Sequence, residues 1–251
     1  MRFTCILLGL ILTTLAQANM RAPMSTREPP GSVLTGSNGL TVLHENLRFE
    51  CNDACVVVAM YSVAAASDGD YQFTFVTPDP AQLAVKVNQT PVDVAHGPLA
   101  VDQARRIGEI NGRARARPPA QARFETALRA GHNEIQVSYR QVHGLQEHGH
   151  SYFSKGRFVR HFRYELWPLK EWARAPDFTL DLVVLLPSEP PGYFARRSGR
   201  YPVIVCGADE NSTLPQARTI RSDTQLEYHV RFSEFPDHLF CRIGDADLLG
   251  R

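Results

Sequence analysis

Apolar and polar side chains alternate along several short stretches of this chain. The alternation is clearest in the segments Leu47 to Cys51, Cys55 to Val63 and Tyr71 to Phe75. A period of two is typical of β-strands that bury one face. Further strands are predicted at Leu83 to Val87, Phe124 to Leu128, Ile135 to Tyr139, Phe158 to Leu166, Phe178 to Leu186, Tyr201 to Val205, Leu226 to Phe232 and Leu239 to Ile243.

Gly, Pro, Asn and Asp separate these stretches, and the pattern of a helix is weak even in its best segment, Leu99 to Ile110. Short strands with such turns predict an all-β fold. We expect an antiparallel β-sandwich, jelly-roll or immunoglobulin-like, built as one large unit or two contiguous ones.

The predicted order begins with a signal peptide at residues 1–18 and an extended arm at 19–38. A β-sandwich unit follows at 39–142, then a His- and Gly-rich loop at 143–156. A second β unit occupies 157–251, either separately or packed into the same domain.

The leader has a basic start at Arg2, an apolar run from Cys5 to Leu15 and a small-x-small site at Ala16 to Ala18. This pattern predicts a cleaved secretory signal. The alternative is a retained interfacial anchor, since the run is shorter than the roughly 20 residues that span a bilayer. We therefore expect an exported protein, periplasmic or else secreted.

Charge is balanced, with 27 Lys and Arg against 26 Asp and Glu among 251 residues. Cleavage after Ala18 would remove Arg2 and Cys5, which leaves 26 basic and 26 acidic residues and four cysteines. Such a balance gives no overall attraction to nucleic acid or to membrane surfaces. Only three of the basic residues are Lys, which favours a GC-rich bacterial source.

Four cysteines in an exported chain predict two disulfides. Cys51 and Cys55 bracket a turn-type sequence, and Cys206 and Cys241 lie on predicted strands. Of the three connectivities, 51–55 with 206–241 is favoured, because the others join two separate regions. Metal binding or disulfide exchange at the closely spaced pair is the alternative.

His143, His148 and His150 cluster in the predicted loop, and His161 follows on the next strand. Imidazole is a good zinc or copper ligand, so these residues are the candidate metal site. The alternative is a solvated loop and a protein without a cofactor.

An arginine-rich stretch includes Arg113, Arg115 and Arg117. Guanidinium groups suit phosphate and carboxylate, so an anionic glycan, a lipid phosphate or an acidic protein is a candidate ligand. No aromatic residue is interleaved there to stack on bases, so nucleic acid is not expected. The alternative is a solvated charged loop.

Aromatic residues gather near the predicted loop, among them Tyr152, Trp167 and Trp172. They are candidates for stacking on a sugar face, or alternatively for packing in the core.

One set of residues lies in the predicted opening hairpin and a second set further along the chain. They are Gly39, Leu40, Glu45, Leu47, Val56, Val58, Tyr61 and Pro78, followed by Tyr164, Leu166 and Trp172. In these residues the chain resembles an uncharacterised class of exported bacterial β-sandwich proteins.

Residues 85–88 and 128–135 in turn resemble jelly-roll carbohydrate-binding domains. This chain departs from their usual phrase in having Gln89 where Gly is typical. The resemblance implies a sandwich fold and makes a carbohydrate-binding module one functional alternative.

Motifs for catalysis are missing: the sequence has no Gly-x-Ser-x-Gly, no His-Glu-x-x-His and no phosphate-binding loop. The sequence thus favours a non-catalytic bacterial envelope protein that acts as a binding or accessory module. Its expected partner is an envelope protein or glycan. The alternatives are a carbohydrate-binding module and a metal-dependent hydrolase.

Overall fold

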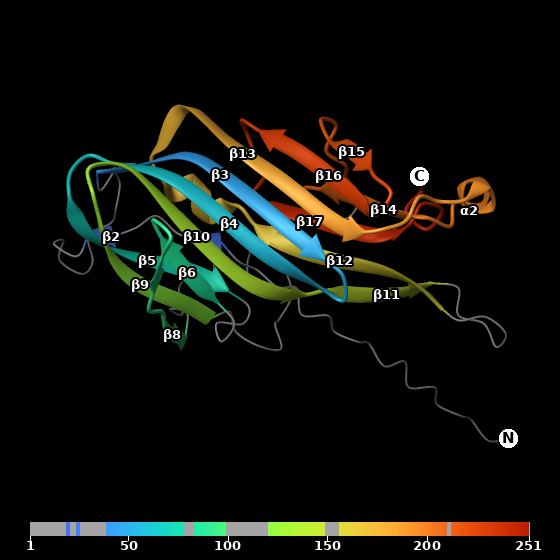
Figure 1. The fold of residues 1–251 in the computed structure, drawn as a ribbon, viewed down its shortest axis with the longest axis horizontal. Helices are drawn as coiled ribbons and strands as arrows, with labels where there is room; N and C mark the ends of the chain where they lie inside the picture. Colours follow the sequence, from blue (N-terminus) through green and yellow to red (C-terminus); the bar gives the residue numbers. More distant parts are fainter. Residues whose placement is uncertain are drawn as a thin grey trace, which may run out of the picture.

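The computed structural model describes residues 19–20, 24–25, 39–77, 83–98, 120–148, 156–209 and 212–250, and the regular secondary structure of this part of the chain is nearly all strand (Figure 1). No helix in the described ranges is long and apolar enough to cross a membrane. The strands are β1 (Asn19–Met20), β2 (Met24–Ser25), β3 (Leu40–Cys51), β4 (Ala54–Ala65), β5 (Gly69–Thr77), β6 (Ala84–Val87), β7 (Thr90–Val92), β8 (Ala95–Pro98), β9 (Ala120–Leu128), β10 (Gly131–Val142), β11 (Gly144–His148), β12 (Arg157–Glu165), β13 (Arg174–Pro187), β14 (Pro202–Gly207), β15 (Arg218–Arg221), β16 (Gln225–Phe232) and β17 (His238–Asp245). Two short helices accompany them, the 3-10 helix η2 (Trp167–Glu171) and the α-helix α2 (Tyr193–Ser198).

The largest sheet has eight strands in the order β15-β16-β13-β3-β4-β10-β6-β7. Strand β13 pairs with β3 in parallel, and the other neighbours in this sheet are antiparallel. The parallel pair joins strands from the two halves of the chain. One sheet thus contains strands from both β units that the sequence outlined.

Two smaller sheets pack against the eight-stranded one. The first has the order β1-β5-β9-β8, with β2 also on β5, and the second has the order β11-β12-β17-β14. Phe75 of β5 contacts Tyr139 at a ring distance of 5.7 Å, while Phe49 stacks on Phe162 of β12 at 4.7 Å. The fold is an all-β sandwich, as the alternating pattern predicted.

Trp172 fills the interior beside helix η2. Its indole lies 6.3 Å from the ring of Tyr61 and 6.2 Å from that of Phe73, and the residue is only 5% exposed. Tyr61 belongs to the eight-stranded sheet and Phe73 to the five-stranded one. The prediction of a sugar-stacking Trp172 is wrong, because neighbouring rings cover the indole; the alternative, core packing, is what the structure contains.

Both favoured cysteine pairs lie at disulfide distance. Cys51 and Cys55 close the β3–β4 hairpin with Cα atoms 4.0 Å apart, and Cys206 and Cys241 face each other on β14 and β17 at 4.1 Å. The four sulfurs are buried in the core. The closely spaced pair is therefore oxidised rather than free.

The structure also departs from the predicted elements. Gly144–His148 forms strand β11 where a loop was expected, because its backbone pairs with β12 at the edge of a sheet. Within the predicted arm, Asn19–Met20 and Met24–Ser25 pair with β5. The weak helical segment at residues 99–110 lies outside the described residues.

The two disulfides are expected to contribute unequally to stability. Loop entropy predicts that Cys206→Ser/Cys241→Ser lowers the free energy of unfolding by about 4 kcal/mol and Cys51→Ser/Cys55→Ser by about 2 kcal/mol, because the sequence separations are 35 and 4 residues. Urea denaturation of both variants measures this. An equal or larger loss from the short pair would contradict the expectation.

Candidate functional site

Helix α2 stands at one end of the molecule, between β13 and β14, and none of its residues is buried (Figure 1). Tyr193 is 70% exposed and Phe194 82% exposed, and their rings meet edge to face at 5.4 Å. We call residues 192–201 the α2 protrusion. Two adjacent aromatic rings exposed to this extent are unusual on a protein surface that faces water.

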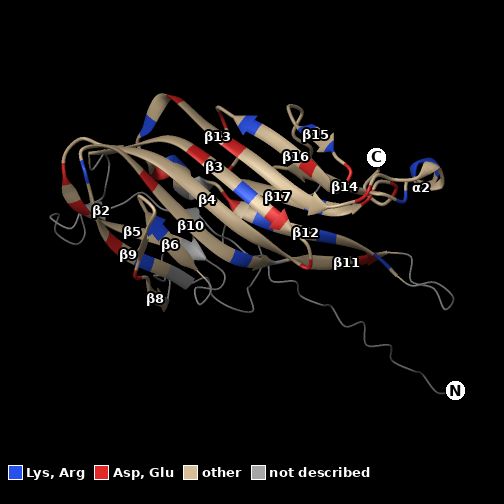
Figure 2. Ribbon diagram, viewed as in Figure 1, with Lys and Arg blue, Asp and Glu red and all other residues tan. Residues whose placement is uncertain are grey.

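The α2 protrusion is positively charged. It contains Arg196, Arg197 and Arg200, and no acidic residue occurs between Glu189 and Asp209. Figure 2 shows the basic residues gathered over this helix. A shallow, open hollow lies against it, lined by Phe194, Ala195, Arg197, Ser198 and Arg200.

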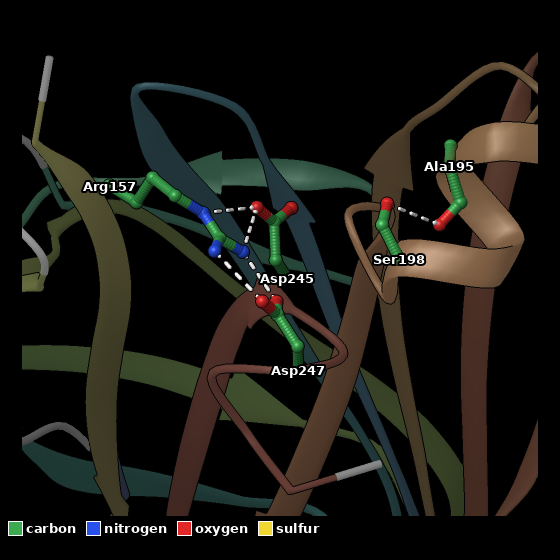
Figure 3. Close-up of polar contacts among 5 residues, drawn as sticks. All are labelled: Arg157, Ala195, Ser198, Asp245 and Asp247. Carbon is green, nitrogen blue, oxygen red and sulfur yellow. Dashed lines mark hydrogen bonds and ion pairs between the residues drawn. The ribbon is translucent and has the colours of Figure 1, made fainter. Parts of the chain in front are cut away.

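Local sequence accounts for the shape of the protrusion. Gly192 begins the helix, and Gly199 ends it in the left-handed conformation with φ of 68°. The Arg200 amide donates to the Ala195 carbonyl at 3.0 Å, and the Ser198 hydroxyl donates to the same oxygen at 3.3 Å (Figure 3). A Cβ on Gly199 would lie 2.9 Å from that of Asp247, so glycine is required there on two grounds.

An ion-pair network anchors the base of the protrusion (Figure 3). Arg157 of β12 donates from Nε to Asp245 at 3.0 Å and from Nη1 to Asp247 at 2.8 Å. The bond from Arg157 lowers the pKa of Asp247. Asp247 in turn donates its amide to the Gly199 carbonyl at 3.1 Å, so the network holds the C-terminal segment against the end of α2.

A second arginine supports the other side of the base. Arg221 of β15 donates to the carbonyl of Pro202 at 2.7 Å and to the hydroxyl of Ser188 at 2.9 Å, and it lies 5.8 Å from the ring of Tyr201. Strands of two different sheets, β12 and β15, thus hold the base of the α2 protrusion. Its aromatic tip is exposed while its base is fixed.

The described candidate histidines lie on or beside two neighbouring strands, β11 and β12, and His161 is near enough to His143 for its charge to lower the pKa of His143. His143 is buried with Nε2 3.8 Å from the Cys55 sulfur, whereas His161 lies opposite Gly144 and stacks on Phe240 at 5.7 Å. His148 ends β11 opposite Arg157, and His150 lies outside the described residues. Burial, reinforced by Arg160, lowers the pKa of His143 to about 4, so this imidazole is neutral at physiological pH.

Among the described residues, Cys51, Cys55 and His143 form a group whose ligand atoms lie within 4.8 Å of one another. The sequence proposed metal chemistry for the histidines and, separately, for the cysteine pair. The structure brings His143 to the cysteines instead. Both sulfurs are bonded to each other, so neither is a thiolate in this state.

The remaining candidates cannot be placed with their side chains. Arg113, Arg115, Arg117 and Tyr152 lie outside the described residues, and for Trp167 only the backbone is described, in η2. The arginine-rich and sugar-stacking hypotheses at these positions stay predictions.

A buried carboxylic acid escaped the sequence analysis as a site residue. Glu45 of β3 is fully buried, and the Tyr164 hydroxyl lies 3.5 Å from its Oε1. Among the described residues, none forms a hydrogen bond with its Oε2. Burial raises the pKa of Glu45 to about 8, against hydrogen bonds from Tyr61 and Tyr164 that lower it. The available signal was position, since Glu45 precedes Leu47 by two residues on the face that β3 buries.

Two further polar groups extend this buried set. The Tyr139 hydroxyl donates to Gln141 at 3.4 Å, and Gln141 donates to the Arg163 carbonyl at 2.9 Å. Burial and the charge on Glu45 raise the pKa of Tyr139. The cluster links the eight-stranded sheet to β12. Because the cluster is buried, the protonated form of Glu45 is favoured there.

Comparison with known proteins gives a fold relationship and no family. No family model matches the chain, and no curated protein matches it. Among solved structures, a candidate nutrient-binding protein from Legionella pneumophila is similar with a TM-score of 0.52 and 13% identity, over 91% of this chain and 72% of that one. At this identity the likeness shows the fold alone.

Two further solved structures are more distant. A two-domain M1 zinc metallopeptidase bound to L-tryptophan has a TM-score of 0.40 and 11% identity, and the match spans 82% of this chain and 43% of the peptidase. An M1 zinc metallopeptidase from Deinococcus radiodurans has a TM-score of 0.38 and 10% identity, over 81% and 42%. This chain thus spans less than half of either peptidase.

Glu45 makes a testable contribution to pH dependence. Its pKa of about 8 in the folded protein exceeds the model-compound value of 4.5, so the folded state keeps a proton that the unfolded chain releases. The contribution of Glu45 to the free energy of unfolding is complete below pH 4.5. It decreases by on the order of 4 kcal/mol as the pH rises to about 8.

Urea denaturation at pH 5 and pH 8 measures the effect in the native protein and in Glu45→Gln. Glutamine keeps the shape of the side chain and does not titrate. The free energy of unfolding of the variant should therefore differ much less between the two pH values than that of the native protein. An unchanged difference would show that Glu45 ionises normally.

Proposed function

We propose that the protein is an exported, non-catalytic binding module of the bacterial envelope that contacts its partner through the α2 protrusion. The observation that carries the proposal is the pair of exposed rings, Tyr193 and Phe194, on an anchored base. Aromatic and arginine side chains dominate binding energy at interfaces. Both kinds meet at this tip.

Anchoring favours binding because it reduces the entropy lost on association. The segment that follows α2 is held at two points, since Gly199 accepts a hydrogen bond from the Asp247 amide and Pro202 accepts one from Arg221. A partner that covers the rings therefore gains the apolar contact without first ordering the helix.

A binding role also agrees with the interior. Trp172 and Glu45 are enclosed between the sheets, so neither is available to a substrate at the surface. The name of the similar Legionella protein belongs to the same broad class of function, although the likeness establishes the fold only. Export is supported by the leader pattern at residues 1–18 and by two disulfides, which persist in oxidising compartments.

The proposal predicts that Tyr193→Ala/Phe194→Ala weakens binding of the mature protein to bacterial envelope by roughly tenfold or more, since two interface anchors are removed. Sedimentation with envelope fractions measures it. The matched control is Val56→Ala, which shortens a side chain 50% exposed on β4 and should leave binding unchanged. Equal binding by all three proteins would contradict a role for the protrusion.

Metal binding is a second candidate, favoured by the closeness of Cys51, Cys55 and His143. We propose that zinc or copper binds there only after a thiol reductant has supplied the two electrons and two protons that convert the disulfide to two thiols. Two thiolates and a neutral imidazole are good ligands for either metal. A hydrolytic role would in addition need an open coordination position.

The metal proposal predicts no zinc retained by the oxidised protein and one equivalent retained after reduction and gel filtration, lost in His143→Ala. Elemental analysis measures the zinc. Metal held by the oxidised protein, and lost in His148→Ala/His150→Ala, would instead favour the histidine site predicted from the sequence.

A further inference from the structure

We infer that the partner of the α2 protrusion is an anionic lipid surface, an inference that rests on the proposed function and names the chemistry of its ligand. Three features of the protrusion support it: its exposed aromatic rings, its charge and its small contact area.

The tip carries two exposed aromatic rings. Tyr193 and Phe194 are neighbours in the sequence, and they are the two most exposed large apolar side chains of the described residues. The helix stands at one end of the molecule, so a flat surface can meet it with the sheets behind (Figure 1). Aromatic rings are favoured at the level of lipid headgroups, where an apolar body meets polar surroundings.

The charge around the tip selects anionic headgroups. Arg196, Arg197 and Arg200 lie within one short segment that has no acidic residue. The carboxylates closest to its base, Asp245 and Asp247, are paired with Arg157. Long arginine stems let guanidinium groups reach phosphates while the rings enter the interface.

The contact area argues against a folded protein partner. A stable protein interface buries about 800 Å² on each side, whereas α2 has only six residues, Tyr193 to Ser198. A bilayer needs no complementary patch, because lipids rearrange around the side chains. An acidic protein groove is therefore the less favoured partner.

Vesicle flotation of the full mature protein, with both disulfides intact, tests the inference. We expect binding to vesicles of phosphatidylglycerol and phosphatidylcholine, at least tenfold weaker binding to phosphatidylcholine alone, and release by 0.5 M salt, roughly the range in which surface charges are screened. Phe194→Ala and Arg197→Gln/Arg200→Gln should each weaken binding at least threefold. Val56→Ala is the control, and circular dichroism verifies the fold of each variant.

The outcomes separate the two proposals. In one outcome, Tyr193→Ala/Phe194→Ala reduces binding to envelope fractions, but the native protein does not bind lipid vesicles. The partner is then a protein or glycan. The lipid inference is wrong in that case, and the proposed function stands. Equal, salt-insensitive binding to neutral vesicles would also overturn the inference. If the variant binds both envelope and vesicles as the native protein does, both proposals fail.

Discussion

The parallel pairing of β13 with β3 is the constraint on which the rest of the structure depends. Residues 179–185 run beside residues 44–50 and join strands from distant parts of the chain into one sheet. The face of β3 that carries Phe49 then packs against Phe162 and Tyr164 of the four-stranded sheet. Close packing of this kind leaves the ends and edges of the sheets for contact with other molecules. At one end of the molecule, α2 carries the two most exposed large apolar side chains of the described residues.

The same pairing places a polar group in the interior. Glu45 lies opposite Leu180 on one side and Tyr61 on the other, and Tyr164 reaches it from the facing sheet. A charged carboxylate would be costly there, so the protonated form is favoured. The polar cluster connects the layers through specific contacts, whereas the apolar rings around it fill space. The stability of the protein consequently depends on pH through Glu45, which is not part of the α2 protrusion.

Local pattern was enough to predict much of the fold. Alternation in β3, β4 and β5 identified the buried faces, and the spacing of cysteines favoured the two pairs that lie at disulfide distance. The β13–β3 pair joins residues more than a hundred positions apart, and no local pattern specifies such a partner. Strand β11 was missed because its one apolar side chain, Leu145, is exposed, so the strand shows no alternating pattern and is defined by its backbone pairing.

The candidate site was harder to predict for related reasons. The sequence Tyr-Phe-Ala-Arg-Arg gives no sign that its rings remain uncovered, since exposure depends on the anchoring by Arg157 and Arg221 from other strands. Likewise, His143 meets Cys55 only because β10 runs antiparallel to β4. The neighbours of each candidate residue are set by the three-dimensional arrangement and not by the local sequence.

Hydrogen exchange of the protein bound to anionic vesicles tests the central claim, binding through the α2 protrusion, most directly. Amides of residues 193–201 should exchange more slowly in the bound protein, while those of β3 and β13 should not change. Slower exchange confined to another surface, with residues 193–201 unaffected, would contradict it.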